Sequence, residues 1–271
     1  MASWWPLVLK WLFRARPVPG KVVIMNALSM AAARQRSRAS APGRQLTTLG
    51  PLAQLRAGKL ARRLPQLMLG LVLYGVSMVL LIRATLGVMP WDVLHQGVAE
   101  HVPWTFGTVV IVTSLVVLLL WIPIRQQPGL GTVLNAVVIG VVVDIVMPWV
   151  PEMDGWAARG GLMVAGLLLN AVATAMYIGS QLGPGPRDGL MTGFARTTGL
   201  SLRLVRTVIE IVVVVVGWLL GGVFGLGTVL YALAIGPLTQ AMLPWFTVSL
   251  DHPPAAGAPL RGPGGARRTS P

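Results

Sequence analysis

The chain of 271 residues is 54% hydrophobic and only 11% charged, and its mean hydropathy is +0.71. A soluble domain carries about 25% charged residues, so this composition predicts an integral membrane protein. The net charge of +14 does not predict nucleic-acid binding, because 12 of the 22 Lys and Arg residues precede residue 65 and the others lie in or beside short gaps between apolar runs or in the C-terminal tail.

Cofactor chemistry and catalysis are not expected. The chain has no cysteine, which excludes disulfides and thiolate metal sites. The nearest histidines, His95 and His101, are six residues apart and would face different sides of a helix, so they do not form a zinc pair. No nucleophile–base pair or metal cluster emerges either. The chain is therefore predicted to hold no cofactor and no metal and to have no enzymatic activity.

Residues 1–65 are predicted to form a basic, mostly disordered cytoplasmic extension. They contain no Asp or Glu and no apolar run long enough to span a bilayer. Such basic density suits the anionic inner leaflet of a membrane. The alternative is that translation begins at Met25 or Met30, in which case part of the extension is not made.

Six apolar runs follow, each about 20 residues long, as a bilayer core about 30 Å thick requires. After the first and fourth runs come two more polar segments, 86–101 and 182–198, which are predicted to be short re-entrant or interfacial helices. The tail 248–271 is rich in Pro and Gly and is predicted to be disordered and cytoplasmic. The predicted spans are residues 66–83, 104–124, 130–150, 160–180, 204–222 and 227–247.

The membrane region contains the same unit twice, at a constant offset of 96 residues. Residues 86–150 align without a gap on residues 182–246, and 22 of the 65 aligned positions are identical. Many of the matches are Gly, Pro, Asp and Trp, which apolar composition alone would not align. The chain is therefore predicted to consist of repeat 1, residues 66–150, and repeat 2, residues 160–247.

Lys and Arg concentrate on the cytoplasmic side of membrane proteins. Segment 84–103 has neither but contains Asp92 and Glu100, so it is predicted to face outward. Segment 182–206 contains four arginines and is predicted to face the cytoplasm, as are the basic N-terminal region and the tail with its three arginines. The gap 151–158, with two acidic residues, is predicted to lie outside. The chain would thus have both termini inside.

Each repeat contains three predicted spans, and an odd number places the second repeat upside down relative to the first. The predicted fold is an all-α membrane protein whose six transmembrane helices form two inverted-topology three-helix repeats, each with a short motif helix. Such repeats are typical of secondary transporters, which bind their substrates near the bilayer midplane between the repeats.

Three strings of residues in the membrane region form recognisable motifs: Arg83–Asp92, Gly183–Leu190, and Gly225–Thr228 with Ile235–Pro237. These strings resemble motifs of the bacterial YczE/YyaS/YitT family of integral membrane proteins, and the resemblance covers roughly residues 66–247. It implies a multi-span protein of the bacterial cytoplasmic membrane. The shorter YczE-like branch fits best, because the soluble domain of the YitT branch has no counterpart here.

Asp92, Asp188 and Arg187 are the predicted substrate-binding residues. Each aspartate follows a Gly and a Pro that end the preceding helix, and a broken helix at membrane depth persists only where it is buried in protein or lines a wet cavity. Arg187 would clamp an anionic group of the substrate. The alternatives are that the aspartates only cap helices and that Arg187 only anchors the cytoplasmic face.

Asp144, Gln240 and Glu210 are the predicted ion-coupling residues. Asp144 lies well inside the third span, where a carboxylate is costly and is a functional candidate, and Gln240 is its counterpart in repeat 2. Asp144 would carry a proton or a cation, or would merely pair with a neighbouring helix. Glu210 lies four residues after Arg206, so a local ion pair is the simplest account of it.

These features predict a small secondary transporter or permease for a small polar or anionic solute. Its predicted partners are the lipid bilayer and that solute, without nucleic acid. The alternative is a membrane scaffold that transports nothing and docks a partner enzyme through its basic N-terminal segment.

Overall fold

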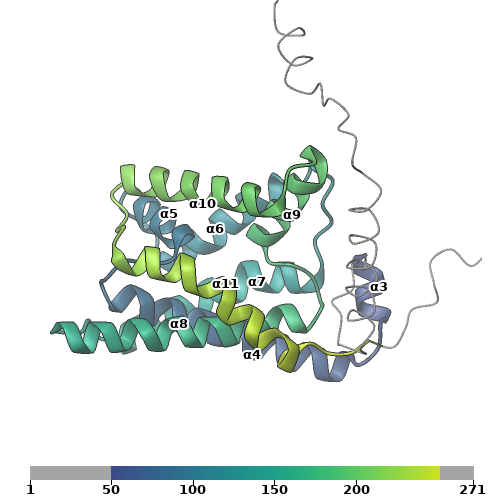
Figure 1. The fold of residues 1–271 in the computed structure, drawn as a ribbon, viewed down its shortest axis with the longest axis horizontal. Helices are drawn as coiled ribbons and strands as arrows, with labels where there is room; N and C mark the ends of the chain where they lie inside the picture. The colour runs from purple at the N-terminus through teal and green to yellow at the C-terminus, as the bar shows by residue number, and fades with distance from the viewer. Residues whose placement is uncertain (1–49, 251–271) are drawn as a thin grey trace, which may run out of the picture. The chain divides into compact units, whose positions relative to one another are not determined.

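The structure is a computed structural model that describes residues 50–250, and all regular secondary structure in that range is helical. Figure 1 shows how these helices are arranged. They are α3 (Pro51–Arg56), α4 (Leu60–Arg83), α5 (Pro90–Ala99), α6 (Phe106–Leu119), α7 (Leu130–Val146) with the short 3₁₀ turn η1 (Met147–Trp149), α8 (Trp156–Gly179), α9 (Pro186–Thr198), α10 (Leu202–Leu219) and α11 (Leu226–Phe246).

The helices follow the 96-residue offset of the sequence. Helix α8 begins 96 residues after α4, and α9, α10 and α11 begin 96 residues after α5, α6 and α7. The two motif helices, α5 and α9, both start at a proline in their first turn, where the fixed φ of proline is favourable and its missing N–H costs no hydrogen bond. They have 10 and 13 residues, too few to cross a bilayer.

The turns between the helices also repeat. Positive φ angles occur at Lys59, Thr85, Gly87 and Arg125, and again 96 residues later at Gly155, Gln181, Gly183 and Gly221. A positive φ is uncommon for residues other than Gly, so chance does not account for four such coincidences. Each repeat therefore folds with the same helices and the same turns.

The core lies around α4 and α8, which pack on each other through small residues. A Cβ on Gly70 would lie 2.9 Å from the backbone nitrogen of Tyr177, so only glycine allows this approach. Helix α7 packs on α4, and α11 packs on α8. The motif helices cross over to the other repeat, because α5 packs on α10 and α9 on α6.

The loops before the two motif helices are held by bonds that the repeats exchange. The Gly227 amide donates to the Leu86 carbonyl at 2.7 Å, and the Gly131 amide donates to the Leu182 carbonyl at the same distance. Each glycine amide is in the first turn of a helix, where N–H groups have no partner within the helix. Each repeat thus supplies the donor that the broken backbone of the other repeat needs.

A buried polar contact joins the start of α4 to the residues that follow α8. Arg63, in the first turn of α4, is fully buried and donates to the carbonyls of Ser180 and Gln181 at 2.8 and 2.7 Å. Helix α4 thus begins six residues before the predicted span, and α3 lies within the predicted extension 1–65. The rest of that extension, up to residue 49, and the tail from residue 251 are outside the described residues.

Four helices are long and apolar enough to cross a membrane among residues 50–250, where the sequence predicted six spans. They are α4, α7 with η1, α8 and α11. Helix α6 has 14 residues, a rise of about 21 Å, which is shorter than the apolar core of about 30 Å. Helix α10 has 18 residues but contains Arg203, Arg206 and Glu210 in its first half.

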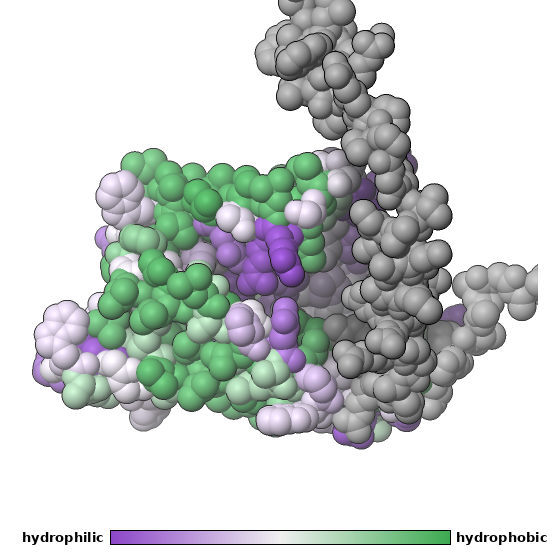
Figure 2. Space-filling model, in the orientation of Figure 1, coloured by the Kyte–Doolittle hydropathy of each residue, from purple (hydrophilic) through white to green (hydrophobic). Residues whose placement is uncertain are grey.

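The surface is apolar over large areas, as expected where lipid rather than water is the solvent. Figure 2 shows hydrophobic surface along α10 and α11, with hydrophilic surface between the two helices. Patches larger than a few hundred Å² are rare on soluble monomers. Large exposed apolar side chains on these two helices include Ile211, Val212, Trp218, Leu219, Leu226, Leu233 and Trp245.

Replacing Gly87 or Gly183 by alanine is expected to destabilise the protein. A Cβ on Gly87 would lie 2.8 Å from the Thr228 hydroxyl, and one on Gly183 would lie 2.9 Å from that of Thr132. Thermal unfolding in detergent should show a loss of about 2–4 kcal/mol for either variant. Gly155→Ala is the control, because Gly155 has a positive φ but open space at its Cβ. An equal loss in the control would show that the close contact between repeats contributes nothing.

Candidate functional site

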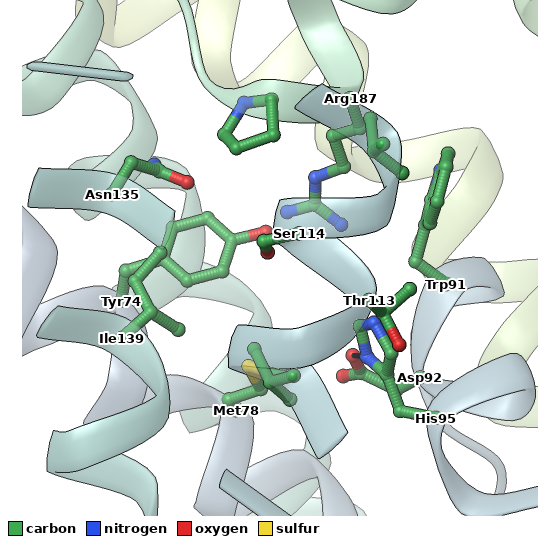
Figure 3. Close-up of a pocket in the computed structure, with 13 residues that line it drawn as sticks. Tyr74, Met78, Trp91, Asp92, His95, Thr113, Ser114, Asn135, Ile139 and Arg187 are labelled. Atoms are coloured by element: carbon green, nitrogen blue, oxygen red, sulfur yellow. Dashed lines mark hydrogen bonds and ion pairs between the residues drawn. The ribbon is translucent and has the colours of Figure 1, made fainter. Parts of the chain in front are cut away.

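A pocket of about 430 Å³, part of it open to the outside, lies where the two repeats meet (Figure 3). The first turns of both motif helices line it, α5 from repeat 1 and α9 from repeat 2. Ligand sites are typically mostly apolar clefts with a few polar groups, and this lining has that character. The lining residues are Tyr74, Met78, Trp91, Asp92, His95, Val110, Thr113, Ser114, Val117, Asn135, Ile139, Pro186 and Arg187.

Asp92 is the buried acid of the pocket. It lies in the first turn of α5, where a carboxylate is favoured by the positive end of the helix dipole, and its side chain is fully buried. Its Oδ1 lies 3.0 Å from Nδ1 of His95, one helical turn away. Its Oδ2 is also buried and has no hydrogen-bond partner among residues 50–250. A buried carboxylate therefore retains an unused acceptor at the pocket.

Arg187 is the cation of the pocket. Its guanidinium carbon lies 5.3 Å from the centre of the Tyr74 ring, in a cation–π contact, and the side chain points into the pocket (Figure 3). The ion pairs between Arg and acidic side chains of the described residues are Arg83–Glu152 and Arg206–Glu210, while Asp92 lies beside His95, which is charged only when protonated. Arg187 is thus paired with no carboxylate in that part of the chain.

Trp91 occupies the position in repeat 1 that Arg187 occupies in repeat 2. Both line the pocket, so the two repeats contribute equivalent positions to one site. The indole Nε1 of Trp91 is buried and has no acceptor among the described side chains and backbone groups. A buried indole N–H usually has a partner, so this group is a second unused polar atom near the site.

Asp188 is not among the lining residues, although it is the counterpart of Asp92. It accepts a hydrogen bond from the Tyr177 hydroxyl of α8, and it interacts electrostatically with Arg206 of α10. The Tyr177 ring in turn packs edge-on against Tyr74, with ring centres 6.2 Å apart. Asp188 therefore links α9 to α8 beside the pocket, and its predicted role in substrate binding stays a prediction.

Asp144 is bonded to the N-terminus of α6. It accepts from the Thr105 hydroxyl at 2.5 Å and from the Gly107 amide at 2.8 Å. These bonds satisfy a first-turn amide that has no partner within its helix, and they hold α6 against α7. They agree with the alternative in which Asp144 pairs with a neighbouring helix, and ion coupling stays a prediction.

Glu210 and Gln240 also lie outside the pocket lining. Glu210 accepts from Arg206 at 2.8 Å, the local ion pair that its spacing indicated. Gln240 is exposed on α11. The structure thus brings Asp92 and Arg187 to one pocket, while Asp144, Glu210, Gln240 and Asp188 lie elsewhere.

Sequence reasoning did not identify His95 and Tyr74 as site residues. The three-residue spacing of Asp92 and His95 on one helix face was an available signal. The position of Tyr74 under Arg187 depends on how α4 packs against α9, and nothing local in the sequence indicates it. A buried network was missed for the same reason: Tyr231 donates to Asn170 at 2.7 Å, and Asn170 donates to Ser77 at 2.8 Å.

Residues 61–244 match a family of unknown function, DUF6198. The uncharacterised membrane protein YczE of Bacillus subtilis is 32% identical over 172 residues, which are 63% of this chain and 80% of YczE. The chain belongs to the YczE/YyaS-like family of membrane proteins. The resemblance to YczE and YyaS inferred from the motifs is thereby confirmed.

Two further relatives extend the comparison. An uncharacterised protein of Haemophilus influenzae is 39% identical over 177 residues, 65% of this chain and 81% of that protein. The uncharacterised protein YyaS of Bacillus subtilis is 23% identical over 183 residues, 65% of this chain and 90% of YyaS. No solved structure matches the chain. The family match runs from the first turn of α4 to the last turn of α11, so it includes every residue that lines the pocket.

Asp144→Ala is expected to destabilise the protein by about 1–2 kcal/mol, the usual loss when a helix cap is removed. Asp144→Asn should be nearly neutral, because Asn caps about as well as Asp. Asp154→Ala, at an exposed loop position, is the control. Thermal unfolding in detergent measures all three. If Asp144→Asn keeps the stability but abolishes transport, the carboxylate carries an ion; if both are kept, capping is its whole role.

Proposed function

We propose that this chain is a multi-pass secondary transporter of the bacterial cytoplasmic membrane, with both termini inside, for a small polar or anionic solute. The pocket is the observation that supports this proposal most strongly. The first turns of α5 and α9 line it from different repeats, and Arg187 supplies a cation that has no carboxylate partner among residues 50–250. Backbone N–H groups at helix N-termini favour anionic groups of a ligand. Breaks in equivalent helices of two repeats are the usual mark of a transporter site.

The proposed six spans are α4, α6, α7, α8, α10 and α11, three from each repeat. The reciprocal bonds at Leu86 and Leu182 support a two-fold relation between the repeats, since a two-fold interface repeats every contact with the partners exchanged. An axis in the membrane plane would then invert repeat 2. This proposal requires the bilayer to be locally thinned around the short helix α6, and the charged side chains in the first half of α10 to extend to the membrane interface.

The charges support the same orientation. The segment of α5 has no Lys or Arg, whereas α9 and the start of α10 contain Arg187, Arg196, Arg203 and Arg206. Trp149 and Trp156, both highly exposed, flank the gap proposed to lie outside, and Trp is enriched at membrane interfaces.

The repeats differ in how their equivalent helices pack, and this difference supports transport. In repeat 1, a Cβ on Gly140 of α7 would overlap with the Gly107 carbonyl of α6, so these helices are in close contact. The equivalent Gly236 of α11 has open space at its Cβ. Hydrophilic surface lies between α10 and α11, on the side where repeat 2 is open (Figure 2).

A transporter must expose its site to each side in turn, and two repeats in different conformations provide this when they exchange conformations. With the proposed orientation, the contact of α6 with α7 closes the outer side, and the separation of α10 from α11 opens the inner side. A membrane scaffold that docks an enzyme would need neither a pocket nor this asymmetry.

The proposed orientation is tested by cysteine labelling, because the natural chain has no cysteine. Cysteine at position 100 should react with a membrane-impermeant reagent in intact cells, and cysteine at position 196 only after permeabilisation. Both native residues, Glu100 and Arg196, are exposed in the structure, so the reagent can reach either position. Labelling of both positions from one side would contradict the inverted relation.

The proposed alternation is tested by cross-linking. Ser201 and Gln240 are the counterparts of Thr105 and Asp144, which are in hydrogen-bond contact. The pair Ser201→Cys and Gln240→Cys should cross-link in membranes with a short thiol reagent, because α10 closes on α11 in the second state. The pair Thr105→Cys and Asp144→Cys is the control for the closed side. A scaffold with one conformation would cross-link only at the control pair.

A further inference from the structure

The pocket combines a cation and an acid that do not neutralise each other. We propose that its ligand is a small zwitterion, with an anionic group bound at Arg187 and a protonated amine bound at Asp92. This inference rests on the proposed function and narrows its substrate class from polar or anionic solutes to compounds that carry both charges.

The acidic end of the site is the Oδ2 atom of Asp92. The other oxygen of the carboxylate is bonded to His95, while Oδ2 is buried and unpartnered among the described residues. Leaving a buried acceptor without a donor costs about 1–3 kcal/mol, and more when the group is charged. An ammonium group is acceptor-free and carries three N–H donors, so it satisfies this oxygen and compensates its charge.

The basic end is built from two donors at equivalent positions of the repeats. Tyr74 contacts Arg187 through its ring and takes none of the guanidinium N–H groups in that contact. Those groups can bind a carboxylate or a similar planar anion by two parallel bonds. The free Nε1 of Trp91 can donate to the same anionic group. In Figure 3 the Arg187 and Trp91 side chains lie on one side of the pocket and the Asp92–His95 pair below them.

Ligands with a single charge fit this site less well. An anion without an amine would leave the Asp92 oxygen unmatched and would bring a second negative charge into the pocket. A cation without an anionic group would lie beside the unpaired Arg187. A bound proton at Asp92 would also remove the unmatched charge, so an anion that enters together with a proton is the competing explanation.

Binding is measured on the full-length protein in detergent, by calorimetry and thermal shift. The probes are unbranched ω-amino acids of two to six carbons, with the carboxylic acid and the primary amine of matching length. At least one amino acid should bind ten or more times more tightly than its matched acid and its matched amine. Binding by the acid with equal affinity, or no binding by any amino acid of the series, would overturn the proposal.

Variants assign the two ends of the ligand. Asp92→Asn should weaken binding of the amino acid at least tenfold and should tighten binding of the matched acid, because it removes a negative charge from the pocket, whereas Arg187→Gln should weaken both. Trp91→Phe keeps an aromatic side chain and should weaken the amino acid several-fold by removing one donor. Asp154→Asn and Arg62→Gln, at exposed positions, are the matched controls. Unchanged amino-acid binding in Asp92→Asn would overturn the assignment of the amine.

A flux experiment distinguishes failure of the zwitterion proposal from failure of the transport proposal. Flux into proteoliposomes of an acid together with a proton would support transport and exclude the zwitterion. Tight binding of a zwitterion without flux would support this inference and contradict transport.

Discussion

The rest of this structure depends on how the broken backbone before each motif helix is satisfied. The loops before α5 and α9 contain positive φ angles at Thr85 and Gln181, and a broken backbone inside a bilayer has no water to bond. The carbonyls of Leu86 and Leu182 are instead bonded to glycine amides of the other repeat. One repeat alone would leave its own break unsatisfied. This fold therefore needs a second copy of the repeat beside the first, and the glycines at the junction are fixed by the close approach that the exchanged bonds need.

The exchanged bonds also determine where the pocket lies and why its two ends differ in charge. They draw the first turns of α5 and α9 together, so Trp91 and its counterpart Arg187 both line one site. In repeat 1 Trp91 is followed by Asp92, and one carboxylate oxygen of Asp92 lies 3.0 Å from Nδ1 of His95. In repeat 2 Arg187 is followed by Asp188, and Asp188 accepts a hydrogen bond from the hydroxyl of Tyr177 in α8. Because equivalent positions carry different residues, the pocket has one acidic end and one basic end. Two identical repeats would have produced two equivalent ends.

The sequence indicated the features that depend on local patterns. The offset of 96 residues, the starts of the motif helices at Pro90 and Pro186, and the ion pair of Glu210 with Arg206 all follow from spacing along the chain. Features that depend on packing between distant segments were not predictable. The burial of Arg63 against Ser180 and the bond of Asp144 to Gly107 join segments that are far apart in sequence. For Asp144 the sequence indicated either ion coupling or a bond to a neighbouring helix, and it did not identify the bonded groups.

The same sequence explains why two similar repeats do not pack in the same way. Helices α6 and α7 approach closely because glycine stands on both sides of their contact, at positions 107 and 140. In repeat 2 the counterpart of Gly140 is Gly236, but the counterpart of Gly107 is Arg203. A guanidinium at that position cannot enter the contact without losing its hydration, so α10 can approach α11 as closely only if Arg203 extends along the helix surface toward water. The single difference between Gly107 and Arg203 thus accounts for the close contact of α6 with α7 and for the open space at the equivalent Gly236 of α11.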